Sequence, residues 1–197
     1  MTAASPASGA RRLTLEAWTT LPDEEPGEWV DGWLVEEEVA TPIHEAIVAL
    51  LITILRGWLG ARGLVGASNG RFQVATTRGR KPDLFVYFPG SRLPRGNSSL
   101  IDLAPDIVVE VVSARPSDQR RDRIEKLAEY ARFGARFYWL VDPQLRSFEI
   151  LQLGTDGRYV HAVTASEGRI EDIPGCEGLA VDVDEIWREV ERLDGEP

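Results

Sequence analysis

The chain has little cysteine, little lysine and no surplus of positive charge, and each shortage narrows what it can be. Cys176 is the single cysteine among 197 residues, so no internal disulfide can form, and we expect a protein of the reducing cytoplasm. The formal net charge is −10, from 22 basic and 32 acidic residues. Because non-specific DNA affinity comes mostly from Lys and Arg that neutralise phosphates, this balance argues against a broad phosphate-binding surface and leaves only a local basic groove open.

Long apolar runs are scarce as well. No run approaches the roughly 18 residues that a membrane span needs, so we expect no membrane association. The first ten residues lack the apolar centre of a signal peptide, and residues 1–12 are expected to be a disordered lead-in. Residues 13–193 are expected to form one domain, because their length suits a single core and no repeat or long linker divides them.

The most informative stretch that is present runs from Ile107 to Ser113. Its β-branched apolar residues predict a strand buried on both faces, yet Glu110 lies within it. An ionised carboxylate in such a place costs several kcal/mol unless it meets a metal, a donor or a cation. Either Glu110 lies at a solvent-facing rim or it has a partner. A second strand-like stretch, Lys81 to Phe88, carries Asp83, and two carboxylates on neighbouring core strands predict a metal site.

Helices and strands alternate along the rest of the chain. Helices are expected at Leu15–Thr20, from Thr41 to either Gly60 or Gly63, at Asp118–Phe133 and at Val183–Leu193. Strands are expected within Glu28–Glu37, Arg71–Ala75, Asp83–Phe88, Asp106–Val112, Arg136–Val141, Ser147–Leu153 and Arg158–Val163, and Arg78–Lys81 is expected to be a basic turn. A strand–helix–strand unit makes its two strands parallel. The pattern predicts an α/β fold with a mixed central sheet flanked by helices.

The two lysines stand out against twenty arginines. Lys81 lies two residues before Asp83, and Lys126 lies on the helix that follows Glu110. The apolar side of that helix, which is expected to face the core, holds Ile124, Leu127, Ala128 and Ala131. Lys126 lies roughly 100–140° from the centre of this side. It is either a surface lysine paired with Asp122 or a lysine that reaches toward Glu110, and its spacing leaves both interpretations open.

Several motifs in this order resemble the Uma-two family of restriction endonucleases, within the PD-(D/E)XK nuclease superfamily. They are Glu28 to Gly32, Pro42 to His44, Lys81-Pro82-Asp83, Glu110 to Ser113, Asp122…Lys126…Tyr130 and Tyr138 to Pro143, and they span about residues 13–188. The resemblance implies a restriction-endonuclease-like fold and metal-dependent hydrolysis of DNA. It implies that Asp83 and Glu110 hold Mg²⁺ or Mn²⁺ beside a catalytic lysine.

One position departs from the superfamily pattern, which places a lysine two residues after the Glu. Val112 occupies that position here, and the resemblance indicates that Lys126 replaces the missing lysine. His44, Glu28 and Asp122 are candidates for supporting roles. If Lys126 does not serve, the alternative is a weak or inactive member of the fold that acts as a nucleic-acid or protein interaction module. A homodimer is the expected assembly, and one further alternative is a DNA groove that forms only on dimerisation.

Overall fold

The computed structural model describes residues 11–22, 25, 27–35, 40–67 and 70–195. Its centre is a six-stranded sheet in the order β11-β10-β9-β8-β7-β4. The strands are β4 (Leu64–Ala67), β7 (Leu84–Tyr87), β8 (Ile107–Val111), β9 (Phe137–Asp142), β10 (Ser147–Leu153) and β11 (Tyr159–Ala165). β8 and β9 are parallel and the other neighbours are antiparallel, so the mixed sheet and the parallel pair are confirmed.

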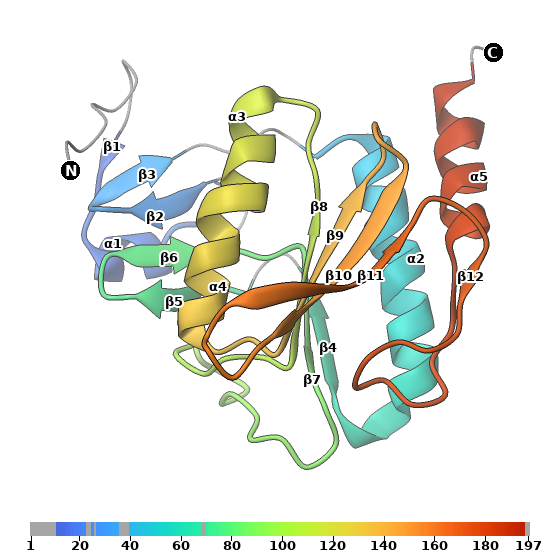
Figure 1. Cartoon of the computed structure of the whole chain (residues 1–197). Helices are drawn as coiled ribbons and strands as arrows, with labels where there is room; N and C mark the ends of the chain where they lie inside the picture. Colours follow the sequence, from blue (N-terminus) through green and yellow to red (C-terminus); the bar gives the residue numbers. More distant parts are fainter. Residues whose placement is uncertain (1–10, 23–24, 26, 36–39, 68–69, 196–197) are drawn as a thin grey trace.

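A five-stranded sheet in the order β1-β3-β2-β6-β5 lies to one side of the central sheet (Figure 1). Its strands are β1 (Arg11–Arg12), β2 (Glu28–Val30), β3 (Trp33–Val35), β5 (Phe72–Ala75) and β6 (Arg78–Arg80). Helix α1 (Leu15–Thr19) packs on it through Trp18. A third pair joins β12 (Arg169–Ile170) to β13 (Val181–Asp182).

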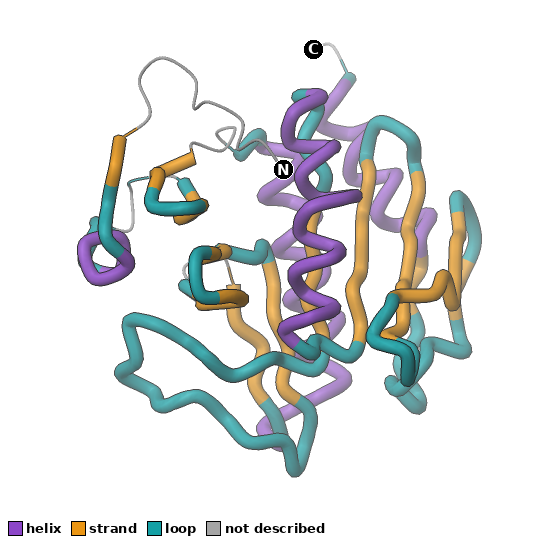
Figure 2. Tube along the Cα trace, turned by 60° about the vertical axis from the view of Figure 1, so that its left-hand side comes forward, coloured by secondary structure: helices purple, strands orange, loops and turns teal. Residues whose placement is uncertain are grey.

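Helices cover both faces of the central sheet (Figures 1 and 2). One face packs against α2 (Pro42–Leu59) and α5 (Val183–Asp194), and between them lies the largest apolar core. The other face meets a continuous helical segment made of α3 (Pro116–Arg120), the π-helical turn η2 (Arg121–Lys126) and α4 (Leu127–Phe133). That segment lies between the central sheet and β5 of the smaller sheet, and the second core forms there.

Helix α2 follows the sequence rules closely. Thr41 caps it by accepting a hydrogen bond from the backbone N–H of His44 at 3.2 Å, Pro42 occupies its first turn, and Gly60 ends it with φ 61° before the short turn η1 (Gly60–Arg62). By length and composition, Pro42–Arg62 could cross a membrane, contrary to the expectation that no run approaches that length. The helix packs one face against the sheet through its buried residues, Ile47, Val48, Leu51, Leu55 and Leu59.

Several expected boundaries were wrong. Arg78–Arg80 is strand β6 and pairs with β2 and β5, where a basic turn was expected. Arg11 and Arg12 pair with β3, although they fell in the expected disordered lead-in, and the remainder of that lead-in, residues 1–10, lies outside the described residues. β4 was not expected at all, because its small residues Gly66 and Ala67 weaken the strand pattern.

Candidate functional site

The two candidate carboxylates meet across neighbouring strands. β7 and β8 are antiparallel, with Leu84 opposite Val109. Continuing this register by one residue places Asp83, which directly precedes β7, opposite Glu110. One carboxylate oxygen of Asp83, Oδ2, accepts a hydrogen bond from the backbone N–H of Val111 at 2.7 Å, which fixes Asp83 beside Glu110.

Glu110 is buried on the sheet face that the η2–α4 segment covers. Its neighbours on the same strand face, Val108 and Val112, belong to the second core. Oε2 lies 3.0 Å from the Lys126 ammonium, and Oε1 accepts a hydrogen bond from the Tyr130 hydroxyl at 2.7 Å. Glu110 therefore has partners and does not lie at a solvent-facing rim.

Burial raises the pKa of Glu110 well above its ordinary value. The Lys126 ammonium acts in the opposite direction, but the carboxylates of Asp83, Asp122 and Glu28 add to the rise. Burial likewise raises the pKa of Asp122, with Asp83 and Glu28 contributing. Strongly shifted carboxylates of this kind concentrate at sites where a protein handles charge.

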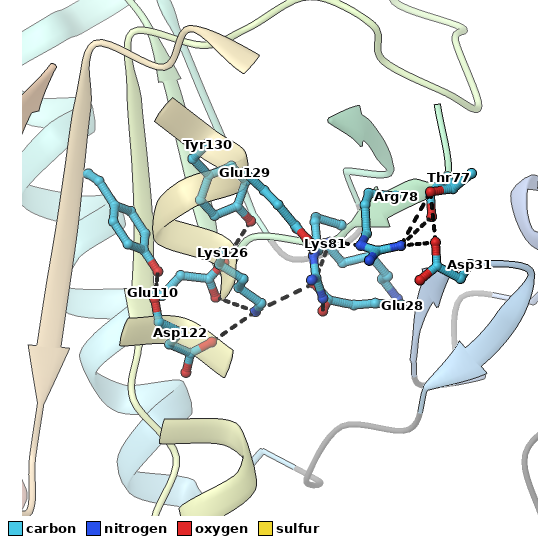
Figure 3. Close-up of polar contacts among 12 residues, drawn as sticks. Glu28, Asp31, Thr77, Arg78, Lys81, Glu110, Asp122, Lys126, Glu129 and Tyr130 are labelled. Carbon is cyan, nitrogen blue, oxygen red and sulfur yellow. Dashed lines mark hydrogen bonds and ion pairs between the residues drawn. The ribbon is translucent and has the colours of Figure 1, made fainter. Parts of the chain in front are cut away.

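Lys126 is enclosed by three carboxylates (Figure 3). Its ammonium lies 3.0 Å from Glu110, 3.1 Å from Asp122 and 3.4 Å from Glu28, and its side chain is 3% exposed. The pair with Asp122 exists, but the interpretation of Lys126 as a surface lysine is wrong. The structure brings Lys126 to Glu110 from the helix, while Val112 stays in the apolar core.

The helix that carries Lys126 packs Leu127 and Ala131 in the core as expected, but it also buries charged residues that were not expected there. Ile124, expected in the core, is 57% exposed, whereas Asp122, Lys126, Glu129 and Tyr130 are buried. The π-helical turn over Arg121–Lys126 changes the angular spacing from that of an α-helix, so a projection at 100° per residue misplaces the buried face. The ion pairs compensate the charges that this face buries.

Asp83 lies at a more open end of the site. Its Oδ1 lies 3.1 Å from Nε2 of His44, which stands in the first turn of α2, and both side chains are 16% exposed. His44 also lines a pocket of about 300 Å³ together with Val111, Ser113 and Gln144. His44, a candidate because of its position at a helix start, therefore contacts one of the two carboxylates.

The donor set at this site fits a divalent cation that retains water. Among the described residues, no three His, Cys, Asp or Glu side chains converge as a complete protein ligand set would. Mg²⁺ needs no such set, because it binds through one or two carboxylates and completes its shell with waters and phosphate oxygens. Asp83 and Glu110, which lie next to each other at the end of β8, offer two hard carboxylate donors, and this matches that requirement.

Sequence reasoning missed two charged residues that belong to this ion cluster, Arg80 and Glu129. Arg80 is fully buried and contacts Glu28 at 2.5 Å and Glu129 at 2.6 Å. Burial acts to raise the pKa of Glu28, but Arg80, Lys126, Arg121 and the backbone N–H of Lys81 together lower it to about 2. Arg80 carried no compositional signal among twenty arginines, and its segment was expected to be a turn. Alternation in Arg78-Gly79-Arg80, with both arginines on one strand face, was the signal that could have found it.

Comparisons with known proteins agree with this architecture. The Uma2 family profile, described as "Putative restriction endonuclease", matches residues 14–184. The crystal structure of a "putative nuclease belonging to DUF820" from Anabaena variabilis ATCC 29413 is similar, with a TM-score of 0.72 and 17% sequence identity, over 90% of this chain and 99% of that one. A search of curated proteins found no match. The structural likeness shows that the fold is the mixed α/β, restriction-endonuclease-like fold.

Proposed function

This chain belongs to the Uma2 family of "Putative restriction endonuclease" proteins, and on that premise we propose that it is a metal-dependent endonuclease that hydrolyses phosphodiester bonds in DNA. The observation that supports this most is the convergence of Asp83, Glu110 and Lys126. Asp83 is bonded to the β8 residue next to Glu110, and an ammonium lies 3.0 Å from Glu110.

Each of these residues has a role that its surroundings support. Asp83 and Glu110 would hold Mg²⁺ or Mn²⁺, and the bound ion would polarise the scissile phosphate and lower the pKa of its water. Lys126 would place a positive charge beside the reacting phosphate, where charge develops in the transition state. Tyr130 fixes Glu110 through its hydroxyl, and the N–H of Val111 fixes Asp83.

The supporting candidates divide by position. His44 contacts Asp83 and lines the adjacent pocket, so it would stand on the substrate side. Asp122 and Glu28 contact Lys126 from the buried side, so they would hold the ammonium in place. We further propose that the protein acts in the cytoplasm as a homodimer, and light scattering of the purified protein tests the assembly.

A second candidate function draws on the burial of the cluster. The side chains of Glu110 and Lys126 are each 3% exposed, and the chain carries a net charge of −10. A closed ion cluster in an acidic protein would suit an interaction module that binds a nucleic acid or a protein without cleaving it. An absence of any heat or melting-temperature change on Mn²⁺ addition would favour this candidate.

The nuclease proposal is tested with supercoiled plasmid DNA. Wild-type protein should nick or linearise the plasmid with Mg²⁺ or Mn²⁺ and should lose this activity in EDTA. Asp83→Asn and Glu110→Gln should each lower the rate by at least about 10²-fold, because each removes a negatively charged metal ligand. Glu189→Gln, in an exposed pair with Arg192, is the matched control and should cleave as wild type does. Equal cleavage by all four preparations would indicate a contaminating nuclease and contradict the proposal.

A further inference from the structure

A buried chain of ion pairs continues from Lys126 into the smaller sheet (Figure 3). Glu28 of β2 accepts from Arg80 of β6 at 2.5 Å, and Arg80 also donates to Glu129 of α4 at 2.6 Å. Glu129 in turn accepts from Nε of Arg78 at 3.0 Å. The candidate lysine is thus connected, through alternating charges, to a part of the fold that the proposed reaction does not use.

Strand β6 directs the side chains of Arg78 and Arg80 toward helix α4. Side chains alternate along a strand, so Arg78 and Arg80 share one face and Gly79 turns to the other. Trp18 packs against that other face, and a Cβ at Gly79 would lie 2.6 Å from its ring. The Trp18 indole N–H donates to the carbonyl of Gly27 at 3.1 Å, which holds the ring in place. This packing fixes the position of strand β6, and with it the position of Arg80 relative to Glu28 and Glu129.

Arg80 and Lys126 both contact the carboxylate of Glu28. One oxygen of Glu28 is bound by Arg80, and the other accepts from the backbone N–H of Lys81 at 3.1 Å while lying 3.4 Å from the Lys126 ammonium. The ammonium is closer to Glu110 at 3.0 Å. If Arg80 did not bind Glu28, that buried carboxylate would rely more on its other cations, among them Lys126, and would draw the ammonium away from Glu110.

We infer that Arg80 and Glu129 are positioning residues, which hold Glu28 in place and thereby direct the Lys126 ammonium toward Glu110. Arg80 is suited to this role because its planar guanidinium contacts two carboxylates in fixed directions, which an ammonium does not reproduce. Glu129 fixes the guanidinium from the far side. The catalytic meaning of this arrangement rests on the proposed nuclease function, but the arrangement can be tested without it.

The two lysines of the chain provide the direct test. In protein made with carbon-13-labelled lysine, the Cε–Hε signals arise from Lys81 and Lys126 alone, and Lys81→Arg assigns them. Glu129→Gln removes one charge at nearly constant shape and should shift the Lys126 signal. Arg80→Gln loses the double contact without adding a third lysine, so it should shift that signal as well. The exposed control Glu189→Gln should leave both signals unchanged.

Folding is monitored separately, because Arg80 is buried and its variants can lose stability. Spectra are recorded well below the midpoint of thermal unfolding of each variant. A lower midpoint with an unmoved Lys126 signal in Glu129→Gln would mean a merely structural pair and would overturn the inference. A shifted Lys126 signal in folded Glu129→Gln supports it, whether or not Arg80→Gln folds.

Cleavage kinetics then connect the arrangement to the reaction. In Glu129→Gln, kcat should fall by up to about 10²-fold while KM changes little, because displacement of a group that acts in the transition state lowers kcat. A shifted Lys126 signal with unchanged kcat would overturn the positioning role. If the wild-type protein fails to cleave DNA at all, the proposed function fails, and the lysine signals still decide how Lys126 is held.

Discussion

The π-helical turn η2 contributes one cation to each of two ion clusters, Lys126 to the first and Arg123 to the second, and the clusters differ in their balance of charge. Lys126 meets three carboxylates, and the side chain is 3% exposed. Three residues earlier, Arg123 meets two carboxylates, Asp142 at 2.8 Å and Glu149 at 2.7 Å, and is 29% exposed. The first cluster sets three carboxylates against one buried ammonium, whereas the second sets two buried carboxylates against one planar, partly exposed guanidinium.

This difference separates a candidate reaction site from a structural clamp. The Arg123 cluster joins η2 to β9 and β10, and Asp142 is further satisfied by the backbone N–H groups of Gln144 and Leu145. The Lys126 cluster leaves the pKa of Glu110 raised, mainly by burial, so its negative charge is not fully compensated. Excess negative charge on buried oxygens is the condition that a divalent cation relieves.

The largest difference between the clusters is expected in cleavage rate. Lys126→Met should lower kcat by about 10²-fold or more, because it removes a preorganised positive charge. Arg123→Met removes a cation of the neighbouring cluster and should leave kcat within a few-fold of wild type. The comparison fails if both variants lose activity equally at matched folded fractions, determined by circular dichroism.

The second prediction concerns acid. The pKa of Glu28 falls from an ordinary value of 4.5 to about 2, because Arg80, Lys126 and Arg121 outweigh its burial. This contribution to stability is present above pH 4.5 and is lost as pH falls toward 2. It corresponds to about 3 kcal/mol at neutral pH. Glu28→Gln should therefore cost about that much in urea unfolding at pH 7, and the cost should shrink between pH 4.5 and pH 2. A cost that does not vary with pH would contradict this account of Glu28.

The third prediction is that replacing one carboxylate with an amide changes the free energy of unfolding in opposite directions in the two clusters. Burial, together with Asp83 and Glu28, raises the pKa of Asp122, so its ionised form destabilises the fold at neutral pH. Asp122→Asn should therefore raise the free energy of unfolding at pH 7. Because a raised pKa favours folding only below the unfolded value of 3.8, the gain should vanish as pH falls below that value.

The matched change in the other cluster is Asp142→Asn. It removes a charge-assisted hydrogen bond to Arg123 and should cost about 1–3 kcal/mol at pH 7. Both variants are measured by chemical denaturation under the same conditions. If Asp122→Asn is as destabilising as Asp142→Asn, the two clusters do not differ in charge balance as described.

The smallest effect is expected for two glycine substitutions outside both clusters, which test how closely the backbone is packed at each position. A Cβ added at Gly57 in α2 would have no atom within 4 Å, so Gly57→Ala should stabilise the protein by up to about 1 kcal/mol through helix propensity. Gly79→Ala would meet Trp18 at 2.6 Å and should instead cost about 1–3 kcal/mol. Thermal unfolding compares the two, and a neutral Gly79→Ala would show that Trp18 does not fix β6.

Much of the architecture was predictable because local rules and burial agreed. Helix α2 has its cap, its first-turn proline and its terminal glycine, and β8 has an unbroken β-branched run on either side of Glu110. The hairpin of β10 and β11 and the final helix α5 also lie where the pattern placed them. In these elements propensity, periodicity and packing favour the same structure.

The site was less predictable because tertiary contacts override those rules there. The expected core face of the helix was chosen by apolar residues, and Ile124 was placed inside, but the π-helical turn and the ion pairs bury Asp122 and Lys126 instead. The choice between a surface and a buried Lys126 could not be made from spacing, because it depends on β2 and β6, which come from distant parts of the sequence. The roles assigned to Asp83, Glu110 and Lys126 remain predictions.

The most direct test of the central claim is the location of a bound ion. Crystals of the wild-type protein are soaked in Mn²⁺, and anomalous difference density is measured. The account predicts one Mn²⁺ bound by the carboxylates of Asp83 and Glu110, and no density there in Asp83→Asn. Mn²⁺ bound elsewhere, together with cleavage that persists in Asp83→Asn, would contradict it.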